Sequence, residues 1–340
     1  MDNLFKIRTL TAAVNAMPAP AMVVYNRLFR QRAHLVPSSR MAVDIRAGSE
    51  RILQSIAVDA DAAVTTKTNR RVITLEAPRL AEKRTISAAS MEDIRKLGDQ
   101  VRVESLADRI REELQDMRNE TDRTMEFWAA NAIKGKIYDA DLTKVLVDYN
   151  LPSSHDITLS GTGDELYWDN ASSDPSAALR DLKLLIEDDC GTTITGWLAF
   201  LGSGVMNALL GHQKIRELLA QERGRAVAES GRVERLSEVD LVEYNGSFID
   251  SSGTRRRFIE RNEIVLIGLC PDLVDCPFAP VVNTKAPGGV GNVDENGRGV
   301  MFFAFSWDKD DGSARWIQVE TRPLPVLQRP GAVVRATVIG

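Results

Sequence analysis

The sequence predicts an α+β fold, and three segments carry that prediction. Residues 52–75 form two extended runs around a polar stretch, and residues 101–134 have the periodicity of one long amphipathic helix. About the last hundred residues are mostly extended, with hairpin signals at positions 245–246 and 311–312. A long helix combined with several extended runs places the chain in the α+β class.

The composition predicts an ordinary folded protein. Of the 340 residues, 44% are hydrophobic and 27% are charged, which is near the average for globular domains and excludes a disordered chain. The formal net charge is −5, from 43 basic and 48 acidic residues. That balance argues against a dedicated nucleic-acid binder, whose surface must neutralise phosphates.

The cysteines and the N-terminus both indicate a protein made in the cytosol. Cys190, Cys270 and Cys276 are too few and too unevenly numbered for a disulfide framework, so we interpret them as buried small apolar residues in a reducing compartment. Residues 1–11 lack the hydrophobic core of a secretion signal, and no apolar run reaches membrane-spanning length.

The first forty residues are expected to form an arm with a short helix. Val24, Leu28 and Phe29 fall at helical spacing, after prolines that interrupt the Ala-rich start. Residues 41–45 then alternate apolar and polar side chains, which predicts a half-buried strand.

A polar stretch at residues 59–71 separates the extended runs 52–58 and 72–75. A loop of this length without structure of its own is uncommon in a compact domain and is usually functional or disordered. Two interpretations stay open: a mobile surface loop, or a strand pair that reaches out and is ordered by a partner.

The long helix carries a regular apolar stripe. Its apolar residues recur at three- and four-residue steps, at Leu106, Ile110, Leu114, Met117, Met125 and Trp128. About 33 residues at ~1.5 Å each give a rod of roughly 50 Å, and Gly135 can end it in a left-handed cap. The stripe is too short for a coiled coil and ends in aromatic residues, so we expect it to pack on a sheet.

Local signals predict the remaining elements. Residues 137–149 are expected to form a tight hairpin, because Asp139-Ala140-Asp141 supplies turn residues between β-prone runs. Asp174 and Pro175 are the favoured pair at a helix start. The other predicted elements are a strand at 192–201, a helix at 205–221, a loop at 277–299 and a strand at 333–339.

No group of residues has a catalytic pattern. Gly202-Ser203-Gly204 follows a strand and precedes a helix, as in a dinucleotide turn, but Asn207 stands where the third glycine belongs. We therefore interpret it as a strand-to-helix turn that needs small residues. The basic run 255–257 is interpreted as a solvated strand edge. Histidines and Asp-rich turns lack the spacing of metal ligands, so no cofactor or metal is expected.

Several short pieces follow one another in a characteristic order. They are Asn26-Arg27-Leu28-Phe29, the strand from Met41 to Ile45, the extended loop, Pro78 to Lys83 leading into Ile86, Ala132 to Lys136, Asp148-Tyr149, Trp168, Asp174-Pro175 and Tyr244-Asn245-Gly246. Each piece is weak alone, and their order is specific. This order resembles the lambda-type major capsid protein of tailed phages, the capsid protein E family, over most of the chain.

The resemblance implies the capsid fold of the Hong Kong phage type, which tailed-phage and herpesvirus shells share. The implied domains are an N-terminal arm at 1–40, a strand and extended loop at 41–85, a peripheral domain with the spine helix at 86–173, an axial domain at 174–299, and C-terminal strands at 300–340 that return to the peripheral domain. The implied function is self-assembly into hexamers and pentamers of the icosahedral shell around double-stranded phage DNA, without enzymatic activity.

The resemblance also implies partners and a location. The short arm implies a separate scaffold protein, and the family pattern implies a portal, a decoration protein and non-specific contact with packaged DNA, with no membrane. The protein is then part of the virion and is present in the host cytoplasm during assembly. Some relatives crosslink a loop lysine to an asparagine; Lys67 is present, but the spacing singles out no pair. Two other functions stay open: a cellular nanocompartment shell, and a cytosolic α+β enzyme with a site at residues 202–207.

A basic series at and after the polar stretch supplies the candidate contact residues. They are Lys67, Arg70, Arg71, Arg79, Lys83 and Arg84. The acidic surplus of the chain offers partners for them on neighbouring subunits. An exposed ion pair contributes only ~0.2 to 1 kcal/mol, but the same contact repeated around a shell acts many times over.

Overall fold

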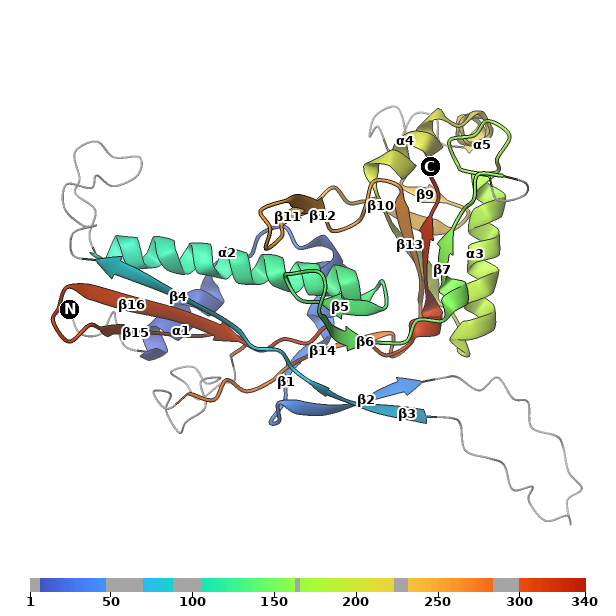
Figure 1. Cartoon of the computed structure of the whole chain (residues 1–340). Coiled ribbons are helices and arrows are strands. Elements are labelled where there is room, and N and C mark those ends of the chain that lie inside the picture. Colours follow the sequence, from blue (N-terminus) through green and yellow to red (C-terminus); the bar gives the residue numbers. More distant parts are fainter. Residues whose placement is uncertain (1–6, 47–69, 88–105, 163–165, 223–231, 284–299) are drawn as a thin grey trace, which may run out of the picture. The chain divides into compact units, whose positions relative to one another are not determined.

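The computed structural model describes residues 7–46, 70–87, 106–162, 166–222, 232–283 and 300–340. The chain divides into two compact units, each built from segments that are far apart in the sequence. Unit 1 contains Met1–Met41, Thr74–Trp128 and Cys276–Val326, and unit 2 contains Ala42–Ile73, Ala129–Asp275 and Leu327–Gly340. Both units contain helices and antiparallel strands, which confirms the α+β class (Figure 1).

Unit 1 has a three-stranded antiparallel sheet with helices beside it. Its strands lie in the order β15–β16–β4. Their bounds are Phe303–Asp308 for β15, Ala314–Thr321 for β16 and Leu80–Ser87 for β4. Figure 1 shows the long helix α2 (Leu106–Ala132) running along β4 and β16. A shorter helix, α1 (Ile7–Ala16), lies against β15, where the Thr11 hydroxyl donates to the Ala304 carbonyl at 3.0 Å.

The apolar stripe of α2 is buried, as predicted. Ile110, Leu114, Met117 and Met125 are almost completely removed from solvent. The predicted first residues of this helix, 101–105, lie outside the described part of the chain. The stop after the helix is also confirmed, because Gly135 has φ +91° and its amide donates to the Ala132 carbonyl at 3.0 Å.

The arm region contains the predicted helical turn. It forms η1 (Tyr25–Phe29) and η2 (Arg30–Arg32), and both carboxylate oxygens of Glu126 accept backbone amides at its start, from Val24 at 2.8 Å and Tyr25 at 2.9 Å. These bonds satisfy amide groups that a helical turn leaves without intrahelical partners. Glu126 is buried, and the two bonds explain how a carboxylate is accommodated there.

A short strand follows this turn. β1 (Ala33–Leu35) pairs in parallel with β14 (Val274–Phe278). The loop predicted at 277–299 is therefore wrong at its start, since Pro277 lies in β14. Proline lacks an amide hydrogen, but its carbonyl still accepts the Leu324 amide at 3.0 Å. Residues 284–299 lie outside the described residues.

Two strands flank the polar stretch. β2 (Arg40–Arg46) and β3 (Arg70–Glu76) form a two-stranded sheet, which confirms the strands predicted at 41–45 and 72–75. The extended run 52–58 and most of the polar stretch lie outside the described residues. Both interpretations of that stretch therefore stay predictions.

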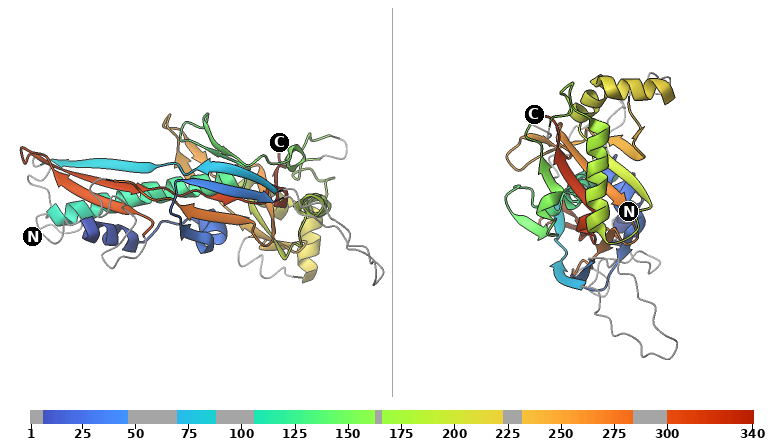
Figure 2. Two further views of the ribbon diagram at one scale, coloured as in Figure 1. Left: turned by 90° about the horizontal axis from the view of Figure 1, so that it is seen from below. Right: turned by 90° about the vertical axis from the view of Figure 1, so that its right-hand side faces the viewer.

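Unit 2 is built on a six-stranded mixed sheet with the order β7–β18–β13–β8–β10–β9. The bounds are Asp156–Thr158 for β7, Val333–Thr337 for β18, Glu263–Leu269 for β13, Gly196–Leu201 for β8, Val239–Glu243 for β10 and Arg235–Leu236 for β9. β8 pairs in parallel with β10 and antiparallel with β13. Helix α3 (Pro175–Cys190) lies beside this sheet (Figures 1 and 2) and contacts β13.

The helices of unit 2 largely follow the sequence signals. Asp174 caps α3 as predicted, accepting the amides of Ser176 and Ala177 at 3.2 Å. The strand predicted at 192–201 is confirmed as β8, with a later start. The single helix predicted at 205–221 is two helices, α4 (Ser203–Gly211) and α5 (Gln213–Glu222), because the backbone at His212 is extended.

One of the hairpin predictions is wrong. Two others are confirmed: β5 (Lys136–Tyr138) pairs with β6 (Val145–Asp148), and β15 pairs with β16 through a turn in which Gly312 has φ +69°. The hairpin predicted at 245–246 does not form. Instead β11 (Ser247–Ile249) pairs with β12 (Arg255–Arg257), and Gly253 supplies the positive φ, +83°.

Within the described ranges, no helix combines the length and the apolar character that crossing a membrane requires. No cluster of three His, Cys, Asp or Glu side chains in these ranges has the arrangement of a metal site.

Candidate inter-subunit surface

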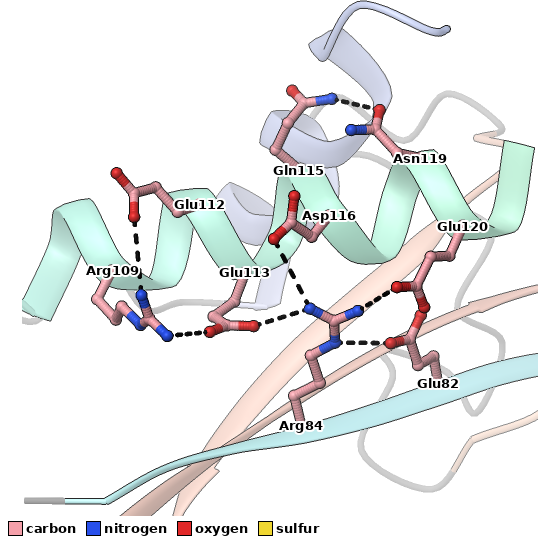
Figure 3. A network of polar contacts seen from close by, with 9 residues as sticks. All are labelled: Glu82, Arg84, Arg109, Glu112, Glu113, Gln115, Asp116, Asn119 and Glu120. Carbon is pink, nitrogen blue, oxygen red and sulfur yellow. Dashed lines mark hydrogen bonds and ion pairs between the residues drawn. The ribbon is translucent and has the colours of Figure 1, made fainter. Parts of the chain in front are cut away.

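Strand β4 carries Lys83 on one face, and it carries Arg84 and its partner Glu82 on the opposite face. Lys83 lies over the ring of Trp316 at 3.7 Å and faces Trp307 at 5.1 Å. Because successive side chains of a strand point to opposite faces, Arg84 is directed away from these rings. Figure 3 shows that Arg84 instead points toward α2. The aromatic face fixes Lys83 by cation–π contact, and the helix face contains an ion network.

Arg84 is the centre of this network, which we call the Arg84 network. Its Nε lies 2.6 Å from Glu82, its Nη1 3.0 Å from Glu113, and its Nη2 2.8 Å from Glu120. A fourth carboxylate, Asp116, lies 3.9 Å from Nη1. One guanidinium group thus serves four carboxylates, three of them on successive turns of α2 (Figure 3).

The network extends along α2 toward its N-terminal end. Arg109 binds Glu113 at 2.7 Å and lies 3.9 Å from Glu112, the i,i+4 and i,i+3 positions that face each other on a helix. Five carboxylates therefore share two guanidinium groups, which leaves an excess of three negative charges (Figure 3). We call the exposed members Glu112, Asp116 and Glu120 the acidic face of α2.

The excess charge affects the ionisation of the network. Burial raises the pKa of Glu82, and the nearby charge of Glu120 raises it further, while the Arg84 guanidinium opposes both effects. Burial disfavours the charged form of Arg84, but the hydrogen bonds to Glu113, Glu82 and Glu120 outweigh it and raise its pKa. Arg84 therefore stays charged, and one more positive group beside Glu82 and Glu120 would relieve their repulsion.

Arg79 directly precedes β4 and has a different environment. Its Nε and Nη2 hold the two oxygens of Glu320 at 3.0 and 2.8 Å. The Glu320 side chain is fully buried, whereas 56% of the Arg79 side chain is exposed. The hydrogen bond to Glu320 raises the pKa of Arg79. A two-bond pair of this kind fixes the arginine while leaving part of it on the surface.

The structure separates the six residues of the basic series. Arg79, Lys83 and Arg84 each have a partner within unit 1. Arg70 and Arg71 begin β3, and Lys67 lies outside the described residues. Sequence reasoning missed the acidic face of α2, although a signal was present. Glu112, Asp116 and Glu120 recur at four-residue steps, which places them on one face of a helix.

The other candidate site, at residues 202–207, has no room for a ligand at the start of α4. A Cβ on Gly202 would lie 2.0 Å from the Glu260 carbonyl oxygen, and one on Gly204 would lie 2.6 Å from that of Arg261. The Arg261 carbonyl also accepts the Val205 amide at 3.1 Å. The chain's own backbone occupies the place where a dinucleotide phosphate would bind, so the small residues serve close packing.

Comparisons with known proteins agree with the fold. The sequence profile of the family "Phage major capsid protein E" matches residues 6–338. The putative capsid protein of a prophage from E. coli CFT073 has a similar structure, with a TM-score of 0.65 and 18% identity over 98% of both chains.

Two further solved structures are similar at lower scores. A phage-related protein from Bordetella bronchiseptica RB50 has a TM-score of 0.52 and 13% identity over 96% of this chain and 95% of its own. The mature capsid of bacteriophage PhiM1 has a TM-score of 0.52 and 15% identity over 91% of this chain and 86% of its own. No curated protein matches this sequence. The chain therefore belongs to the phage major capsid protein E family, and it is a structural component of a phage virion shell.

Proposed function

We propose that the shell is made of hexamers and pentamers in which basic residues of one subunit dock on the acidic face of α2 of its neighbour. The basic residues are Lys67, Arg70 and Arg71, and the receiving residues are Glu112, Asp116 and Glu120. The observation that carries this proposal is the excess of three negative charges in the Arg84 network.

Exposure supports the choice of the receiving residues. The side chains of Asp116 and Glu120 are 66% and 56% exposed, whereas Glu113 is only 15% exposed. Arg84 satisfies the inner carboxylate and leaves the outer two accessible. A head-to-tail contact repeated around a ring needs two different complementary surfaces on each subunit, and a basic segment with an acidic helix face meets that requirement.

The other members of the basic series take different parts in this proposal. Arg79 keeps more than half of its side chain exposed and can reach a neighbour while it holds Glu320. Lys83 and Arg84 orient β4 and α2 by their contacts with Trp316 and Glu113. Lys83 and Arg84 therefore hold the surface in place, whereas the basic and acidic residues named above make the contact between subunits.

A charge-reversal experiment tests the docking. Changing Arg70 and Arg71 to Glu, or Glu112, Asp116 and Glu120 to Lys, should leave the subunit folded by circular dichroism but prevent capsomers in sedimentation velocity. Combining both sets should restore assembly in part, because the charges are again complementary. A control variant carries Lys at Asp181, Glu187 and Asp188, exposed acids of α3. Normal assembly of each single-surface variant at all salt concentrations would exclude the docking.

The proposal extends to other components of the particle. A separate scaffold protein directs assembly, a portal occupies one vertex, a decoration protein binds the outside, and packaged DNA is contacted non-specifically. Support comes from the family membership and from three exposed arginines close together in the arm region, Arg27, Arg30 and Arg32, which can contact phosphates. Electron microscopy of the chain expressed alone and with neighbouring phage genes tests the scaffold. DNA binding that does not weaken with added salt would contradict the phosphate contact.

A further inference from the structure

Two of the three cysteines lie side by side in unit 2. Cys190 is the last residue of α3, and Cys270 directly follows β13. Their sulfur atoms are 3.8 Å apart, and both residues are thiols. Cys190 is buried and Cys270 is half-buried. The third cysteine, Cys276, is buried in β14 and belongs to unit 1.

The backbone on both sides of this pair is held in place. Helix α3 ends in a left-handed cap at Gly191, with φ +60°. The amide and the hydroxyl of Thr195 both donate to the Leu269 carbonyl, at 2.8 and 2.9 Å. The Cys190 and Cys270 segments therefore approach each other at a capped helix end and directly after a paired strand.

Arg329 adds a direct link between the two segments. Its Nε donates to the Pro271 carbonyl at 3.1 Å, and its Nη1 donates to the Cys190 carbonyl at 3.5 Å. The arginine is buried, so its position is fixed by packing. One guanidinium group thus holds the residue after Cys270 and the backbone of Cys190 together.

We propose that Cys190 and Cys270 form a disulfide within the subunit when the particle leaves a reducing cytosol. The sulfur atoms, now 3.8 Å apart, would need to approach to about 2.05 Å. In the cytosol the pair stays reduced, as is usual for intracellular proteins. Outside the cell, oxidants accept the electrons, and the bond then joins α3 to the central sheet of unit 2.

The chemistry with oxidised glutathione is balanced. The more accessible Cys270, as its thiolate, attacks one sulfur of oxidised glutathione and displaces the other half as a thiolate. Cys190, deprotonated, then attacks the Cys270 sulfur and displaces the second glutathione. The protein loses two hydrogens, and two molecules of reduced glutathione form.

The pair is slow to react before it is oxidised. The hydrogen bond with Cys190 and burial both raise the pKa of Cys270. Because the thiolate is the reacting species, the thiol is protected against adventitious oxidation at neutral pH. We therefore expect disulfide formation to be slow at neutral pH and to accelerate as the pH rises.

The disulfide should stabilise the subunit strongly, because the two cysteines are 80 residues apart in the sequence. Closing a loop of that size restricts the unfolded chain more than closing a short loop does. The enclosed segment contains β8, α4, α5 and β13, so the bond ties much of the unit 2 sheet to α3. We expect oxidation to raise the melting temperature of the full-length subunit by roughly 6 °C.

Thiol counting on the full-length chain tests this inference. The protein is incubated with oxidised glutathione at pH 8.5, quenched in acid, denatured and alkylated. We expect only Cys276 to be alkylated after oxidation, against all three cysteines in the reduced protein. Peptide mapping should recover a Cys190–Cys270 crosslink, and the melting temperature should rise and return after reduction.

Three variants make the outcome decisive. Cys190→Ser and Cys270→Ser should each lose both the crosslink and the rise in melting temperature, whereas Cys276→Ala should keep both. A stable glutathione adduct on Cys270 in the wild type, a crosslink between subunits, or three alkylated cysteines after prolonged oxidation would overturn the inference. A crosslink without a rise in melting temperature would overturn the stabilising role.

Discussion

Arg84 in unit 1 and Glu263 in unit 2 are each the centre of an ion network, and the two networks have opposite charge balances. Arg84 is one cation shared by four carboxylates, two of which are more than half exposed. Glu263 is one anion, 1% exposed, that accepts Lys134 and Arg335, each at 2.6 Å, and the Glu260 amide at 3.0 Å. The first network keeps surplus charge at the surface, and the second satisfies its anion completely inside the fold.

The difference follows from the cost of burying charge. A carboxylate removed from water must be fully paired, so a buried network that persists has as many partners as its anion can accept. A half-exposed network has no such requirement, because water solvates its exposed carboxylates. The Glu263 network is therefore expected to matter for folding, and the acidic face of α2 is free of that constraint and available for assembly.

Removing the buried anion is expected to have the largest effect. Glu263→Gln leaves the ammonium of Lys134 buried without a counter-charge and should lower the free energy of unfolding by about 3 to 5 kcal/mol. Urea denaturation at pH 7, followed by circular dichroism, measures the change. The control is Glu187→Gln, an exposed residue of α3, which should change the free energy of unfolding very little. A loss below about 1 kcal/mol would remove the distinction between the two networks.

The same network should make stability depend on acid pH. Burial alone would raise the pKa of Glu263, but Lys134 and Arg335 outweigh it and lower the pKa below its usual value. A lowered folded-state pKa means that the stabilisation is fully present above the unfolded value of about 4.3 and is lost as the pH falls through the folded value. The difference in urea midpoint between wild type and Glu263→Gln should therefore shrink between pH 5 and pH 2. An unchanged difference at pH 2 would contradict the pairing.

Lys134 should make stability rise with pH in the alkaline range, as Glu263 does in the acid range. Burial lowers its pKa more than Glu263 raises it. The folded state therefore releases this proton before the unfolded state does, so this contribution to stability rises with pH between the folded value and about 10.4. Lys134→Met should abolish this rise. Its urea midpoints from pH 8 to pH 10.5, compared with those of the wild type, measure the difference.

The sequence predicted elements whose signals are local and strong. The stripe of α2 and the Asp174 cap of α3 depend on neighbouring residues, and both are confirmed. The hairpin predicted at 245–246 does not form, because pairing with strands distant in the sequence prevails over the local turn signal. β10 bonds β8 in parallel along five residues, an arrangement that no local pattern reveals, and neither Asn245 nor Gly246 takes the positive φ that a two-residue hairpin turn needs.

The charged residues of the candidate surface were predictable from the sequence, but the ion pairs between them were not. The basic series and the four-residue steps of Glu112, Asp116 and Glu120 are visible in the sequence. That Arg84 contacts Glu113 depends on how β4 lies along α2, 29 positions away in the chain. Such a placement is set by tertiary packing, so sequence patterns did not reveal that Arg84, a candidate inter-subunit contact, also has partners within its own subunit.

Removing Arg84 should have a moderate effect on folding. Arg84→Met leaves Glu82, Glu113 and Glu120 close together without their shared cation, and solvent screens part of the repulsion. We expect the free energy of unfolding to fall by about 1 to 2 kcal/mol at pH 7. The loss should become smaller at pH 3, where the carboxylates are protonated. Arg123→Met, at an exposed position on α2, is the matched control and should be nearly neutral.

Neutralising one carboxylate of the acidic face should have the smallest effect on folding. Glu120→Gln removes an ion pair with Arg84 at 2.8 Å, but it also removes the negative charge that raises the pKa of Glu82. The two consequences oppose each other, and we expect the free energy of unfolding to change by less than about 0.5 kcal/mol. The pKa of Glu82 should fall, which a carboxyl NMR titration measures. A loss above about 1 kcal/mol would show that Glu120 is needed inside the subunit, as Glu263 is, and would leave it no separate role at the surface.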